Sequence, residues 1–198
     1  MSRPLILAFD TSAAHCAAAL LSGDAILAEA HLDMAKGQAE ALMPLLEDLL
    51  KQAGHAWRDL DAVAVGVGPG NFTGIRISVA AARGLALGLG VPAIGVSLFE
   101  ALAFGSSGAA LAVVPAPRGA SYVQPVEDGA LQGAPWFSES PVTDPRPLLS
   151  ALPQPLAPVL ARIAASKLAA GGILPRPAPL YIRPADAAPA APAPQILT

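Results

Sequence analysis

Residues 67–76 read VGPGNFTGIR, and this stretch decides how the first half of the chain folds. The apolar run 62–67 precedes it and predicts a buried strand, while the amphipathic run 74–89 follows it and predicts a helix. A glycine-rich turn between a strand and a helix N-terminus exposes backbone N–H groups to an anion. The stretch is therefore the first place to look for a phosphate site.

The side chains that phosphate binding needs are missing from this turn. A nucleotide-triphosphate loop has Gly-Lys followed by Ser or Thr, but Gly74 is followed by Ile75. A dinucleotide loop has a glycine where Pro69 or Asn71 stands. A structural role, as a tight turn that allows close helix packing, is favoured for the set Gly68, Gly70, Thr73 and Gly74, with Thr73 as the helix cap.

The elements on either side of the turn predict one three-layer lobe over residues 1–105. Apolar runs and turn signals indicate strands at 5–10, 15–22 and 25–32, the last with alternating apolar and polar residues. A long amphipathic helix is expected over 34–53, bent by Pro44, and residues 91–96 and 98–104 predict a further strand and a short helix. The order of these elements is strand, strand, strand, helix, strand, helix, strand, helix.

Proline separates the second half from the first, because 4 of the 21 prolines lie before residue 113 and 17 lie after it. The sequence there predicts a second, poorer meander, with strands at 110–115, 121–126 and 130–137, and a helix at 158–170. We expect a shortened C-terminal lobe over 106–183. The segment 184–198 is mostly Ala and Pro and predicts an extended tail.

Composition excludes several classes of protein. The chain has 198 residues, of which 54% are apolar and 14% charged, and a net charge of −3, which argues against disorder and against strong unaided binding of nucleic acid. A single cysteine, Cys16, excludes an intramolecular disulfide and favours the cytoplasm. No run of about 20 apolar residues predicts a membrane span.

The remaining polar residues offer weak candidates for chemistry. Asp10, at the end of the first strand, resembles the acidic residue of actin-like phosphotransferases, but a structural role in the turn is favoured because no glycine follows it. His15, His31 and His55 share no helical turn, so they predict no metal pair. Cys16 in mid-strand is expected to be a buried, unreactive residue.

The two long helices predicted over 34–53 and 74–89 offer more apolar surface than one small lobe easily hides. Burial against the lobe's own sheet and a subunit interface both explain this surface, and the sequence leaves the choice open. The candidate interface residues are Leu42, Leu46, Leu49, Ile75, Val79, Ala82 and Arg83.

Several segments together resemble one family. Residues 6–12 (ILAFDTS), 68–77 (GPGNFTGIRI), 84–88 (GLALG) and 92–97 (PAIGVS) are similar to the bacterial TsaB (YeaZ) family of tRNA threonylcarbamoyladenosine biosynthesis proteins. The likeness is dense over residues 3–104, and residues 179–183 (PLYIR) resemble the closing segment of that family.

The resemblance implies an α/β fold of two ribonuclease H-like lobes of the actin, Hsp70 and sugar kinase superfamily, the second lobe shortened. It also implies a non-catalytic dimerisation subunit, with no cofactor or metal of its own, that pairs through the two helices with the catalytic subunit TsaD. The complex recruits the ATPase TsaE, contacts tRNA, and modifies the adenosine 3′ of the anticodon. A self-sufficient homodimer with a regulatory role is an alternative, since one apolar helix face can pair with a second copy or with a relative.

The chain departs from the family in the second lobe. Pro115-Ala116-Pro117 and Ala120 stand where an Asp-Ala-Arg element and a nearby Glu are usual, and Gln38 replaces a common histidine in the first helix. These departures bear on contacts with TsaE and tRNA. Two alternatives from another class remain, an actin-like phosphotransferase or ATPase and a peptidase homologue, although neither a complete phosphate loop nor a metal pair is found.

Overall fold

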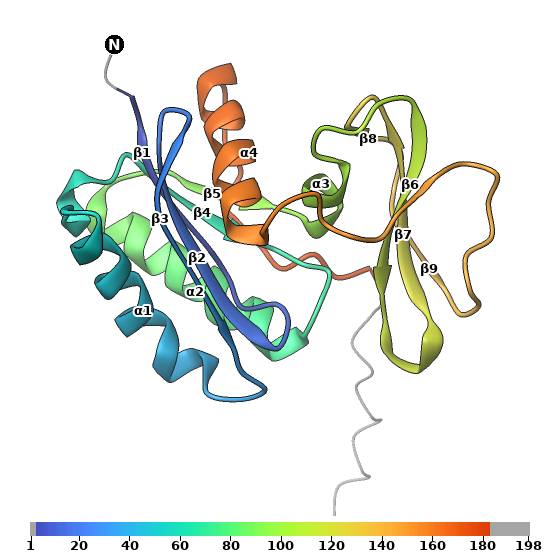
Figure 1. Cartoon of the computed structure of the whole chain (residues 1–198), viewed down its shortest axis with the longest axis horizontal. Helices are drawn as coiled ribbons and strands as arrows, with labels where there is room; N and C mark the ends of the chain where they lie inside the picture. Colours follow the sequence, from blue (N-terminus) through green and yellow to red (C-terminus); the bar gives the residue numbers. More distant parts are fainter. Residues whose placement is uncertain (1–2, 183–198) are drawn as a thin grey trace, which may run out of the picture.

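The computed structural model describes residues 3–182 and has two sheets (Figure 1). The first sheet has the order β3-β2-β1-β4-β5, in which β1 pairs antiparallel with β2 and parallel with β4. Its central strands are buried along their whole length because helices cover both faces. The strands are β1 (Leu5–Asp10), β2 (His15–Ser22), β3 (Ala25–Asp33), β4 (Ala62–Gly66) and β5 (Ala93–Val96).

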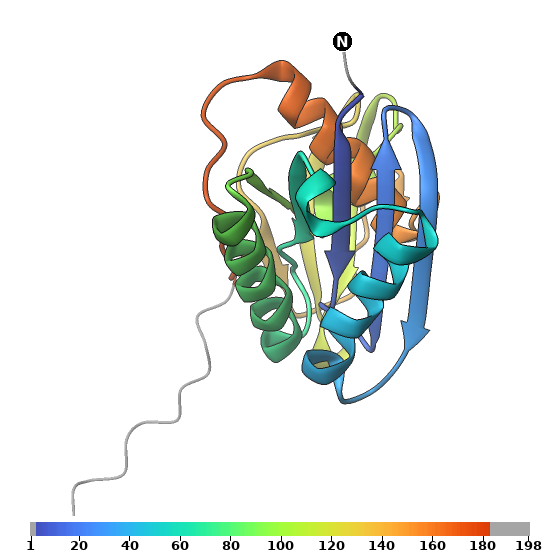
Figure 2. The ribbon, with the colours of Figure 1, turned by 90° about the vertical axis from the view of Figure 1, so that its left-hand side faces the viewer.

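Two helices lie side by side on one face of this sheet, α1 (Gln38–Gln52) and α2 (Phe72–Leu89) (Figure 2). The prediction that α1 begins at residue 34 is wrong, because Gly37 adopts a left-handed conformation with φ of 92° just before the helix. Pro44 lies inside α1. The other face of the sheet is covered by α4 (Leu156–Ala170).

The position of α4 links distant parts of the chain. It packs against the first sheet through Val159, Leu160 and Ala164, in one cluster with Ile6 and Ala64. The first lobe is therefore completed by chain that follows residue 150. The expected lobe limits at residues 105 and 183 stay predictions, and the tail 184–198 lies outside the described residues.

The second sheet is smaller and has the order β10-β6-β7-β8, with β9 also paired to β7. The predicted strand over 130–137 is wrong, because Gly133, with φ of 58°, separates two short strands there. The short helix α3 (Leu98–Ala103) packs on this sheet. The strands are β6 (Ala109–Pro115), β7 (Ser121–Glu127), β8 (Ala130–Leu131), β9 (Trp136–Ser138) and β10 (Leu148–Leu149).

Within residues 3–182, one helix has the length and composition of a membrane span: α2, with a mean hydropathy of 1.3. The core helix of a globular protein passes the same test. Its inward side chains Ile75, Val79 and Ala82 pack in the core beneath the sheet. The apolar composition of α2 is thus used partly by the chain's own core.

Candidate functional site

Two loops meet at the carboxyl ends of β1 and β4. These strands are parallel neighbours, so the loop after β1 and the glycine-rich loop before α2 lie at the same edge of the sheet. Thr11 Oγ1 donates a hydrogen bond of 2.7 Å to the carbonyl of Gly74, and Asn71 N donates one of 2.6 Å to the carbonyl of Ser12. The two loops therefore bind each other at this edge of the sheet.

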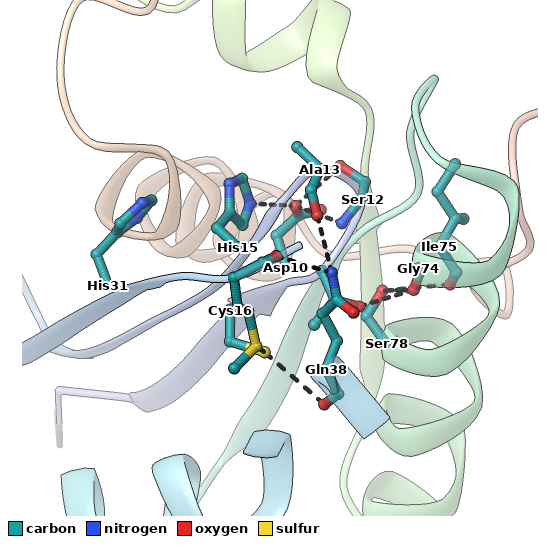
Figure 3. Close-up of polar contacts among 12 residues, drawn as sticks. Asp10, Ser12, Ala13, His15, Cys16, His31, Gln38, Gly74, Ile75 and Ser78 are labelled. Carbon is teal, nitrogen blue, oxygen red and sulfur yellow. Dashed lines mark hydrogen bonds and ion pairs between the residues drawn. The ribbon is translucent and has the colours of Figure 1, made fainter. Parts of the chain in front are cut away.

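Asp10 is bound by its own chain (Figure 3). The residue is 1% exposed, and its Oδ1 accepts hydrogen bonds of 2.8 Å from Ser12 N and from Ser12 Oγ. His15 Nε2 lies 2.8 Å from the same oxygen. On the other side, a Cβ added at Gly66 would fall on Asp10 Oδ2. This geometry supports the structural interpretation of Asp10 over a catalytic one.

The glycines of the loop have steric reasons for being glycine. A Cβ at Gly70 would collide with the carbonyl of Ser12, and one at Gly74 with the carbonyl of Thr11. Gly68 has φ of 90°, which side chains rarely allow. Close approach of the two loops therefore requires these residues, whether or not the loop binds any ligand.

The prediction that Thr73 caps α2 is wrong. The cap is Asn71, whose side-chain oxygen accepts a hydrogen bond of 2.9 Å from Gly74 N, and Thr73 is exposed in the first turn. Asn and Thr are both common caps, so their identity alone did not decide between the two positions.

The predicted interface residues lie inside the molecule, which corrects the proposed surface. The apolar stripes of α1 and α2 face the chain's own sheet, because burying them there removes the largest side chains from water. Arg83 alone of the predicted set is exposed. The buried members, at most 4% exposed, are Leu42, Leu46, Leu49, Ile75, Val79 and Ala82.

The outward face of α2 carries small residues and one large apolar residue. Leu87 is 84% exposed. Ala80, Arg83 and Gly84 lie beside it at helical spacing, Gly88 follows it directly, and all four are exposed. The side chains at positions 80, 84 and 88 are so small that another helix could approach the backbone of α2 closely. We call the set Ala80, Arg83, Gly84, Leu87 and Gly88 the outer face of α2.

A cleft of about 990 Å³ lies between the two lobes. Gln38 lines it from the first lobe, and its Nε2 donates a hydrogen bond of 3.2 Å to the carbonyl of Met34. Pro115, Pro117 and Arg118 line it from the second lobe. The substituted segment of the second lobe is thus a wall of the cleft.

Two segments of the resemblance, residues 68–77 and the described part of the closing segment, residues 179–182, meet at this cleft. Arg76 Nε donates a hydrogen bond of 2.8 Å to Tyr181 Oη, and its guanidinium carbon lies 3.7 Å from the centre of the Phe72 ring. Leu180 N donates to the carbonyl of Val67. Sequence reasoning quoted both segments but missed this contact, because 105 residues separate Arg76 from Tyr181.

The sequence predicted no metal pair among the histidines and an unreactive, buried Cys16. The rings of His15 and His31 lie 5.1 Å apart, because β2 and β3 form a hairpin that brings distant residues together. No group of three or more His, Cys, Asp or Glu that could hold a metal occurs among residues 3–182. Burial, and secondarily the charge of Asp10, raises the pKa of the Cys16 thiol, which disfavours the reactive thiolate.

Comparison with known proteins bears on the family. The family model "TsaD: tRNA N6-adenosine threonylcarbamoyltransferase" matches residues 28–124. TsaB of Escherichia coli is 38% identical over 102 residues, which cover 51% of this chain and 43% of that protein. TsaB of Bacillus subtilis is 40% identical over 98 residues, with 50% and 43% covered. The matched part spans less than half the length of these two relatives.

Two further comparisons extend over nearly the whole chain. An uncharacterised protein of Mycobacterium bovis is 32% identical over an alignment of 200 positions, covering 94% of this chain and 95% of that protein. The solved structure of YeaZ from Pseudomonas aeruginosa has a TM-score of 0.74 at 26% identity, with 90% and 99% covered. This match confirms the α/β fold class that the sequence predicted. From its signature segments, its fold and these relatives, the chain belongs to the TsaB/YeaZ family.

Proposed function

We propose that this chain is a non-catalytic pairing subunit in the biosynthesis of tRNA threonylcarbamoyladenosine. The observation that carries the proposal is the pair of interlocked loops at the ends of β1 and β4. Asp10 Oδ1 already accepts hydrogen bonds from Ser12 and contacts His15, and Oδ2 lies close against Gly66, so the chain itself engages this carboxylate in holding the loop. The names of the TsaB relatives support the proposed pathway, tRNA threonylcarbamoyladenosine biosynthesis.

The partner that we propose is a TsaD protein, which docks on the outer face of α2. An exposed leucine among small residues suits close packing against a helix of a related fold. The exposed side chains of the neighbouring α1 include Glu47 and Asp48, so a partner with basic side chains at the α1 side would also be complemented in charge. Recruitment of TsaE and contact with tRNA through the complex remain predictions.

Co-elution of the purified chain with purified TsaD tests the pairing. We expect one complex at micromolar concentrations, in the range of affinities typical of specific subunits, about −8 kcal/mol. Substitution Leu87→Glu places a charge in the contact and is expected to weaken it by about 2 kcal/mol or more. Absence of a complex, or an unchanged complex with Leu87→Glu, would refute the docking surface.

A matched control is available in the second lobe. Leu148 is also an exposed leucine, at 41%, but it lies on β10, away from α2. The variant Leu148→Glu should pair as the parent does, so that a general effect of added negative charge is separated from loss of the contact. If the chain elutes as a dimer by itself, and Leu87→Glu abolishes this dimer, then the same face pairs two copies.

A further inference from the structure

The cleft between the lobes has a basic side chain on one wall, and the pairing surface does not use it. Among its described lining residues, Arg118 is the only one with a formal charge. Arg118 lies in the turn between β6 and β7 with φ of 64° and ψ of 28°, a left-handed conformation that is uncommon for a residue other than glycine. The turn thus holds a strained arginine at a cleft that no acidic residue lines.

Two aromatic rings, from the start of α2 and from the closing segment of the chain, line the cleft. The centres of Phe72 and Tyr181 lie 5.3 Å apart with their planes tilted by 32°, and the two residues are 42% and 47% exposed. Arg76 fixes both, since it stacks on Phe72 and donates to Tyr181 Oη. Ordered, half-exposed rings beside a guanidinium are a surface on which a flat heteroaromatic base stacks.

The two walls together select a chemical class of ligand. A flat ring stacks on Phe72 and Tyr181, and an anionic group binds Arg118, whose planar guanidinium suits a phosphate. The volume of about 990 Å³ lies at the upper end of ligand pockets and holds such a molecule. We propose that this cleft binds a nucleoside monophosphate unit, with its base on the aromatic rings and its phosphate on Arg118.

This unit can be a free nucleotide or one nucleotide of a single-stranded RNA, because the base and the phosphate would be recognised in the same way in both. The inference does not depend on pairing with TsaD, because the cleft walls belong to this chain alone. It is therefore tested on the isolated full chain, where failure of pairing has no effect on the result.

Calorimetric titration with adenosine 5′-monophosphate (AMP) is the direct test. We expect saturable binding below about 1 mM. Adenosine lacks the phosphate and ribose 5-phosphate lacks the base, so each should bind about tenfold more weakly or worse. No saturable heat with AMP up to about 5 mM, or equal affinity for AMP and ribose 5-phosphate, would overturn the proposal.

The variant Arg118→Gly removes the guanidinium and suits the left-handed backbone. We expect it to fold as stably as the parent, by thermal unfolding, and to bind AMP about tenfold more weakly. Arg58→Ala is the matched control, because it removes an exposed arginine that does not line the cleft, and its AMP affinity should be unchanged. An unchanged affinity in Arg118→Gly would overturn the assignment of the phosphate.

A single-stranded adenylate hexamer distinguishes the two sources of the unit. Tighter binding of the hexamer than of AMP, lost in Arg118→Gly, supports a nucleotide of an RNA strand as the ligand. Equal or weaker binding of the hexamer, with AMP binding still dependent on Arg118, supports a free nucleotide. Both results retain the cleft as the site.

Discussion

The two sheets of this molecule differ in how they are covered. The first sheet has α1 and α2 on one face and α4 on the other, so the side chains of β1 and β4 are buried on both faces. The second sheet has α3 on one face, while the small cluster on its other face is joined by Val142 from a loop. A sheet enclosed by helices needs continuous apolar strands, and a partly covered one does not. This difference accounts for the uninterrupted buried runs of β1 and β4.

The comparison predicts unequal losses from the same substitution in the two lobes. Leu46 (0% exposed) lies in the large cluster beneath the first sheet, and Leu111 (1% exposed) lies in the small cluster of the second. A cavity that its surroundings cannot fill costs more, so Leu46→Ala should lower the free energy of unfolding by about 4 kcal/mol and Leu111→Ala by about 2.5 kcal/mol. Urea denaturation measures both.

The losses measured for Leu46→Ala and Leu111→Ala test whether the second sheet is less enclosed than the first. Equal losses would contradict the claim that the second lobe is less enclosed. Loss of cooperativity in only one variant would show that the lobes unfold separately, since two-state behaviour would then fail.

The first strands of the two lobes also end differently. Strand β1 ends at the buried, hydrogen-bonded Asp10, and β6 ends at the exposed Pro115, although each strand leads into a hairpin with the next strand. Asp10→Ala leaves the donors of Ser12 without a partner and should cost about 3 kcal/mol, whereas Pro115→Ala should change stability by less than about 0.5 kcal/mol. Thermal unfolding of the two variants measures the difference. A stable Asp10→Ala protein would contradict the structural role and reopen the catalytic interpretation.

Much of the first lobe could be predicted from the sequence, because its signals are local. The apolar run at 5–10 and the alternation over 25–32 gave strands that the structure has, with β3 extending to Asp33. The helices were also found, with errors of a few residues at their starts. Buried strands and amphipathic helices have patterns that depend on the segment itself.

The site could be predicted only in part, because its decisive contacts join distant segments. Nothing in the sequence near Arg76 shows that Tyr181 binds it, and nothing near residue 156 shows that α4 completes the first sheet. The direction of the helix stripes was also ambiguous. The sequence pattern of an apolar stripe is the same whether the stripe faces the chain's own sheet or a partner. The structure shows that Leu42 and Val79 pack against the sheet.

The smallest expected effect concerns the start of α2, one of the two helices that cover one face of the first sheet. Asn71 caps the helix through Gly74 N, and the exposed Thr73 does not. Asn71→Ala should therefore cost about 1 kcal/mol in the free energy of unfolding, while Thr73→Ala should cost a few tenths. The two variants differ from the parent by one side chain each within three residues, so chemical denaturation of both separates capping from general disturbance of the loop. A larger loss in Thr73→Ala than in Asn71→Ala would contradict the observed cap, and it would imply that the loop between β4 and α2 adopts another conformation in solution.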